Sequence, residues 1–334
     1  MLISRPFLSP KPVRGYNSIG MNPKSLIYKV GNKVIRHTDW YNNQVWGGAT
    51  KFWNGYQFGL DIVNLGSGAG VHAFCYDGLP VKGANWALGP QSLVHDFNIL
   101  KNYFSYIREG GAVVITVCPF SGLFSKYGKP HNFKYYSFLH PATILNFEEE
   151  ERQSALRLKL NPLKEMPIDS VTKTLKEGIR VAKRSVIALG TTDIEDSARK
   201  TMEGWKKQFG IENLSDPLTE QHQKEISSRS ETLQSMVAFC KERNLHPYIV
   251  IPVMHRSLSS MFPKEFKAMY MDSLTAHSGA PVLDYMDDEM NSEKEYFSTA
   301  LFLSTSGAKI FTQKVINDIN NMEKNRLTQP SRGE

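Results

Sequence analysis

A serine between two glycines is the first place in the chain where side chains of suitable type could do chemistry. Gly66, Ser67 and Gly68 directly follow the apolar run Ile62–Leu65. A buried parallel strand reads as a continuous apolar run, and small residues after it allow a sharp turn. Ligands of open α/β sheets bind in the crevice beyond the carboxyl ends of the strands. Ser67 is therefore a candidate nucleophile, and Gly66 and Gly68 are candidate substrate-binding residues.

A catalytic serine also needs a base, because its hydroxyl is almost never ionised at neutral pH. Two histidines are candidates for this role. His72 follows Ser67 by a few residues, and His255 lies just past a later apolar run. Both are expected at the carboxyl edge of the sheet, although a histidine in such a place is more often a surface or capping residue.

The three cysteines, Cys75, Cys118 and Cys240, are weaker candidates for a catalytic nucleophile than Ser67. A cysteine nucleophile needs a lowered pKa, and a cysteine in or beside a strand usually serves as a small apolar filler. An odd number without Cys-x-x-Cys spacing argues against a disulfide framework or a zinc site and favours a reducing cytoplasm. We expect no metal and no cofactor.

These residues must be positioned by a sheet, and the chain alternates strand and helix patterns. Such alternation predicts an α/β fold with parallel strands and right-handed crossovers. Five strands are expected, at Asp61–Leu65, Val81–Trp86, Ala112–Cys118, Tyr248–Val253 and Pro281–Asp284. The helices expected around them are His72–Tyr76, Gln91–Arg108, Val171–Ala188, Trp205–Phe209, Leu218–Asn244, Pro263–His277 and Ser306–Met322.

The same pattern suggests how the chain is divided. Residues 59–322 form the predicted α/β domain, with residues 120–216 as an insertion or lid. Residues 1–58 are expected to be an N-terminal arm that contains an amphipathic helix near Asn22–Arg36, and residues 323–334 a polar tail. A basic amphipathic helix packs on its own domain or lies on a membrane surface.

Composition bounds the partners. The chain has 334 residues, a net charge of +7 and a pI near 9.1. This charge favours an acidic partner, but no nucleic-acid-binding motif accompanies it. No apolar run reaches the roughly 18 residues that cross a bilayer, and the first residues do not resemble a secretory signal. We expect a cytoplasmic protein that is not integral to a membrane, with peripheral membrane contact left open.

Four segments, in this order, resemble the conserved blocks of the SGNH (GDSL-like) hydrolase superfamily. They are Ile62–Gly68, Asn85–Gly89, Val113–Ser121 and Phe297–Thr312. The similarity is to the divergent branch found among bacterial surface-polysaccharide biosynthesis proteins. It implies a three-layer α/β/α sandwich with about five parallel strands, and a glycine, Gly89, that supplies an oxyanion-hole amide.

The chain departs from this family at the positions that carry its chemistry. Gly68 stands where the family has its nucleophilic serine, and Phe302 where it has the histidine. Thr299 replaces the aspartate, and Ser304 the asparagine of the last block. Cys118–Phe120 replaces the Gly-x-Asn of the third block.

Two functions remain open. The first is a protein of capsule or O-antigen synthesis with a degenerate site that binds a glycan, a lipid-linked glycan or a sugar nucleotide, with polysaccharide-assembly proteins as further partners. The second is a divergent serine esterase or O-acyltransferase that acts on glycan acyl esters through Ser67 with His72 or His255. In either case the candidate substrate-binding residues are Gly66, Gly68, Asn85, Gly89, Phe120 and Ser121.

Overall fold

The computed structural model describes residues 23–53, 57–123, 133–165 and 193–328. The predicted helix Val171–Ala188 lies outside these residues. Within them, five parallel strands form one sheet in the order β2-β1-β3-β4-β5. The strands are β1 Leu60–Leu65, β2 Gly83–Asn85, β3 Ile107–Thr116, β4 His246–Ile251 and β5 Val282–Asp284. The predicted α/β fold with five parallel strands is confirmed.

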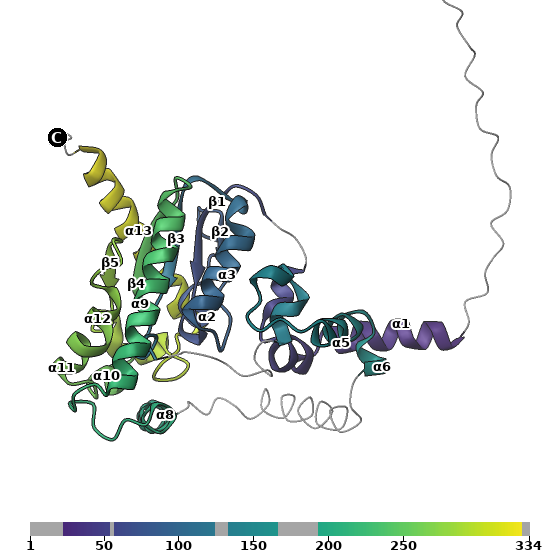
Figure 1. Ribbon diagram of the computed structural model, residues 1–334, viewed down its shortest axis with the longest axis horizontal. Coiled ribbons are helices and arrows are strands. Elements are labelled where there is room, and N and C mark those ends of the chain that lie inside the picture. Colours follow the sequence, from purple (N-terminus) through teal and green to yellow (C-terminus); the bar gives the residue numbers. More distant parts are fainter. Residues whose placement is uncertain (1–22, 54–56, 124–132, 166–192, 329–334) are drawn as a thin grey trace, which may run out of the picture.

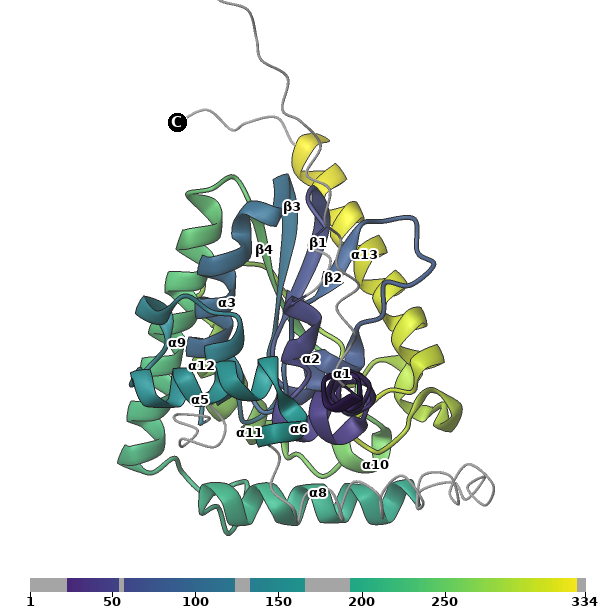
Figure 2. The ribbon, with the colours of Figure 1, turned by 90° about the vertical axis from the view of Figure 1, so that its right-hand side faces the viewer.

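Helices cover both faces of this sheet, which makes a three-layer α/β/α sandwich (Figures 1 and 2). One face carries α3, α9 and α12, and the other carries α2 and α13. The central strands are buried on both sides, and Val63, Val114 and Ile249 are fully buried. This explains why they read as continuous apolar runs rather than as alternating patterns.

The α-helices are α1 Pro23–Arg36, α2 Gly68–Ala73, α3 Leu93–Tyr103, α5 Glu149–Leu160, α6 Pro162–Glu165, α8 Ile194–Phe209, α9 Glu220–Lys241, α10 Arg256–Ser259, α11 Lys264–Phe266, α12 Ser273–Thr275 and α13 Thr305–Thr328. Shorter 3₁₀ or π segments are η1 Trp40–Val45, η2 Ala49–Phe52, η3 Phe104–Tyr106, η4 Phe133–Ser137, η5 Pro141–Thr143, η6 Lys267–Asp272, η7 Glu289–Ser292 and η8 Lys294–Tyr296. None of the described helices is long and apolar enough to cross a membrane.

Some boundaries differ from the sequence prediction. The helix expected to reach Arg108 ends at Tyr103, because β3 already begins at Ile107 and includes two glycines. The register of β1 on β3 shifts between Leu60 and Ile62, which absorbs this longer strand. α2 begins at Gly68, earlier than expected, and α13 continues to Thr328.

Residues 23–53 of the N-terminal arm and residues 133–165 of the insertion form one substructure beside the sandwich (Figure 1). α1 packs on α6, where the Asn32 side chain accepts the N–H of Leu163 at 2.9 Å. Arg36 donates to the carbonyls of Lys159 and Leu160 at the end of α5. The amphipathic helix therefore packs on its own chain with one face, although Val30 and Val34 on another face are exposed.

Candidate functional site

The turn after β1 is hydrogen-bonded to a buried aspartate side chain. The N–H of Gly66 donates to Oδ1 of Asp96, on α3, at 2.8 Å. Gly66 has a φ of +135°, and a Cβ there would lie 2.8 Å from Cβ of Thr116 on β3. Only glycine fits this close approach with that backbone conformation. The turn that the sequence places at the site edge is thus fixed by packing against β3 and by Asp96.

Gln91 joins this turn to the neighbouring loop. Its side-chain amide donates to the carbonyl of Gly66 at 3.2 Å and also to Oδ1 of Asp96, and it accepts the hydroxyl of Tyr135 at 2.9 Å. Its backbone N–H donates to Oγ of Ser67 at 3.1 Å. Ser67 precedes the first turn of α2 and is half-buried. Among the described residues, no hydrogen bond connects its hydroxyl to a histidine.

A phenylalanine ring lies over Gly68. A Cβ built on Gly68 would be 3.3 Å from Cζ of Phe302, and one built on Gly89 would be 3.6 Å from Cα of Gly68. The imidazole of His72 stacks on the same Phe302 ring, with centroids 4.4 Å apart. Partial burial lowers the pKa of His72. The space above the turn is therefore occupied by apolar atoms on one side and by a second glycine on the other.

The loop that carries Phe302 is rigidly supported by its own polar groups. The hydroxyl of Thr299 accepts the N–H groups of Leu301 and Phe302 at 3.3 and 3.1 Å. Oγ of Ser298 donates to the carbonyl of Phe302 at 3.1 Å. Side-chain caps of this kind fix the direction of a short turn. Thr299 therefore holds the Phe302 backbone in place.

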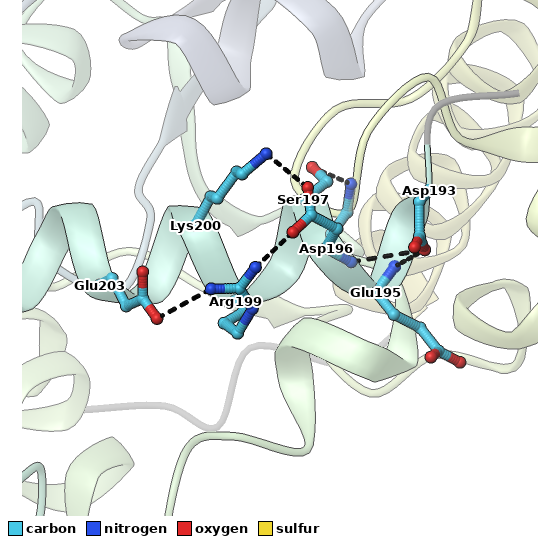
Figure 3. A network of polar contacts seen from close by, with 8 residues as sticks. Asp193, Glu195, Asp196, Ser197, Arg199, Lys200 and Glu203 are labelled. Atoms are coloured by element: carbon cyan, nitrogen blue, oxygen red, sulfur yellow. Dashed lines mark hydrogen bonds and ion pairs between the residues drawn. The ribbon is translucent and has the colours of Figure 1, made fainter. Parts of the chain in front are cut away.

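α8 braces this loop from the carboxyl edge of the sheet, where Figure 2 shows it running across the ends of the strands. Oγ of Ser197 accepts the N–H of Ala300 at 3.2 Å. Figure 3 shows this contact at the start of α8, next to the N-cap Asp193, which accepts two backbone N–H groups. Asp196 pairs with Arg199 and Lys200 on the following turn, which lowers its pKa. The described end of the predicted insertion thus restrains the loop over Gly68.

His255 lies at the same edge but is directed to its own turn. Its Nδ1 is 2.8 Å from Oγ of Ser257 and accepts the N–H of Ser257 at 3.2 Å, so the ring caps α10. The ring meets Phe297 edge-on, with centroids 5.3 Å apart. Burial and the charge of Arg256 lower the pKa of His255. The capping interpretation considered for this histidine describes its contacts.

The side chain of Asn85, at the end of β2, forms hydrogen bonds within the protein. Its Nδ2 donates to the carbonyls of Gly70, Val71 and Phe74 at 3.0 to 3.1 Å. Its Oδ1 accepts N–H groups of Asn64 and Ala87. These bonds tie β2 to α2, and they leave the amide committed to the protein.

The third block gives packing and a tight turn. The Phe120 ring is fully buried among aromatic side chains of the α8 and α11–η6 segments, so no part of it is open to a ligand. Ser121 is also buried, and its Oγ accepts the N–H of Cys118 at 2.8 Å. Burial raises the pKa of the Cys118 thiol, which disfavours the reactive thiolate.

Lys134 and Asp96 belong to a buried polar network beside the Gly66 turn that the sequence did not predict. Lys134 of η4 is buried and donates to the carbonyls of Gly89 and Pro90 at 3.2 and 2.7 Å. Burial lowers its pKa to about 7, and the carboxyl of Asp96 partly opposes that change. Burial raises the pKa of Asp96 to about 7. Neither residue stood out in sequence, because Asp96 lies in an apolar helix pattern and Lys134 in an aromatic segment.

The described residues include no group of three or more His, Cys, Asp and Glu side chains able to hold a metal ion. In comparisons with protein-family models, curated proteins and solved structures, nothing matches this chain.

Proposed function

We propose that this chain is a non-catalytic SGNH-like protein that binds a glycan or glycan precursor in bacterial surface-polysaccharide synthesis. One observation carries the non-catalytic part of the proposal: Gly68 and Phe302, which stand at the family's nucleophile and base positions, face each other at 3.3 Å from a built Cβ to the ring. The spatial pairing of those two positions supports the resemblance. Their identities leave that pair without a nucleophile or a proton acceptor.

The neighbouring replacements point the same way. Thr299, at the aspartate position, is engaged with the backbone of Phe302 instead of a histidine ring. The remaining hydroxyl, that of Ser67, accepts the N–H of Gln91, and the two histidines considered as its base are engaged with Phe302 and Ser257. A serine ester mechanism needs a base within hydrogen-bond reach. The arrangement favours binding over ester hydrolysis or acyl transfer.

The first arm of the test is hydrolysis of p-nitrophenyl acetate and butyrate by the native chain, Ser67→Ala and a control, Ser227→Ala, on the exposed side of α9. We expect all three to give the same rate as buffer. Turnover that is lost in Ser67→Ala and kept in the control would overturn the proposal in favour of the esterase alternative.

The second arm is binding, measured by saturation-transfer NMR with UDP-N-acetylglucosamine and with oligosaccharides from bacterial capsules. We expect transfer to at least one of these probes under conditions where no ester is cleaved. Absence of transfer to every probe would remove the glycan-binding part of the proposal.

A further inference from the structure

A cleft of about 250 Å³ lies beside β2, away from the Gly66–Gly68 turn. β2 is the edge strand of the sheet, so its outer side has no neighbouring strand. Ligand pockets usually measure about 300–1,000 Å³, so this cleft suits one small ring system rather than a chain of sugars. Residues of β2, η2, α3 and η3 and of the loops next to them line it, among them Lys51, Gln57, Trp86, Tyr103 and Tyr106.

Lys51 brings an unneutralised ammonium group to this cleft. Its Nζ donates to the carbonyl of Ala87, and no carboxylate of the described residues pairs with it. Lysine has three N–H donors, so two remain for a ligand. Lys51 is open to solvent through the cleft, but protein atoms surround its ammonium group. This desolvation, together with the nearby charge of Lys134, lowers the pKa of Lys51 to about 7. A bound anion would relieve this electrostatic cost.

Aromatic rings form the apolar part of the same cleft. Trp86 and Tyr103 are buried, with 7% and 6% of their surface exposed, and their ring centroids lie 6.0 Å apart. Tyr106 is half-buried, and it stacks at 4.6 Å on Phe58, which is 69% exposed. A few polar groups among aromatic walls are typical of small-molecule sites. Gln57 also lines the cleft, and its side chain carries an amide that can form hydrogen bonds.

We propose that the cleft beside β2 binds a single sugar unit that carries a phosphate, with the phosphate on the Lys51 ammonium group and the sugar ring against the part of the aromatic wall that includes Tyr106. The inference rests on the proposed function, which it deepens by naming the ligand class and the place of binding. The ligand then lies beside β2 and not over the turn at Gly68, which the Phe302 ring covers.

The test is isothermal titration of the full chain at pH 6.5 and low salt with three probes: glucose 1-phosphate, glucose and inorganic phosphate. We expect saturable binding of glucose 1-phosphate at least tenfold tighter than that of either part. Lys51→Gln should weaken it tenfold or more, and Lys101→Gln, an exposed lysine on α3, should leave it unchanged. Tyr106→Leu should weaken glucose 1-phosphate binding more than phosphate binding.

Thermal unfolding of each variant shows whether a loss of binding is a loss of folding, and Tyr106→Leu provides the test if Lys51→Gln is unstable. No binding of glucose 1-phosphate, or binding indifferent to both substitutions, would overturn the inference. Equal affinity for inorganic phosphate would overturn the sugar-ring contact. Ester turnover that depends on Ser67 would contradict the proposed function and would leave this titration unaffected. Failure of the proposed function can therefore be told apart from failure of the inference about the cleft.

Discussion

Asp96 gives the sharpest prediction, because a buried carboxyl holds the turn at the site. Its Oδ1 accepts the N–H of Gly66 at 2.8 Å, and burial raises its pKa to about 7 from an ordinary 3.8. In the unfolded chain the same group loses its proton near pH 4. Between these two pH values the folded state binds one proton more than the unfolded state.

The sign of the effect follows from this difference. A group with a raised folded pKa contributes stability that is complete below the unfolded pKa and is lost as the pH rises through the folded value. One proton changes the free energy of unfolding by about 1.4 kcal/mol per pH unit, so about 4 kcal/mol is the upper limit over the whole interval. Asp96→Asn removes this dependence and keeps an oxygen for the Gly66 N–H.

We therefore expect the stability of Asp96→Asn relative to the native chain to rise by about 1.4 kcal/mol between pH 5 and pH 6 and to level off above pH 7. Loss of the carboxylate also lowers the pKa of Lys134 further, and this too makes the stability of Asp96→Asn relative to the native chain rise with pH. Urea unfolding at pH 5, 6, 7 and 8 measures it.

Asp61→Asn is the matched control, because Arg108 lowers the pKa of that half-exposed carboxyl and keeps its titration below this pH range. Its stability relative to the native chain should be the same at all four pH values. A constant difference for Asp96→Asn as well would refute the buried-carboxyl account of the turn.

Two further substitutions test how the site is built, each followed by urea unfolding. Gly66→Ala should lower the free energy of unfolding by at least about 2 kcal/mol, because of the contact with Thr116 and a φ of +135°. Its control is Gly204→Ala in α8, where nothing lies within 4 Å, and this change should raise the free energy of unfolding by about 0.5–1 kcal/mol. Phe120→Ala should cost about 3–5 kcal/mol because the ring is fully buried. Phe58→Ala, which removes an exposed ring, should cost far less, and equal losses for the two would contradict the assignment of Phe120 to the core.

The strands were predictable because burial on both faces leaves long apolar runs. Ala112–Cys118 and Tyr248–Val253 matched β3 and β4 to within a few residues at either end, apart from the earlier start of β3. That start, at Ile107, runs through Arg108 to Gly111, which no strand pattern marks, and it depends on pairing with β1 and on a register shift. Local sequence cannot report such long-range pairing.

The site was only partly predictable. The turn at Gly66 was marked by its small residues, whereas Asp96 and Gln91 became visible only once the fold brought α3 beneath that turn. A buried Lys134 could not be anticipated either, since lysine is almost never buried without partners and these partners are backbone carbonyls of a distant loop. The packing of α1 on α6 likewise joins segments that are far apart in the chain.

The most direct measurement of the central claim is reaction of the native chain with a fluorophosphonate, followed by intact-mass and peptide mass spectrometry. Such a reagent modifies a serine only when a base activates its hydroxyl. With Phe302 over Gly68 and the Ser67 hydroxyl engaged with Gln91, we predict no phosphonylated serine after an incubation that fully labels a control serine esterase. Stoichiometric labelling at Ser67, absent in Ser67→Ala, would contradict the account.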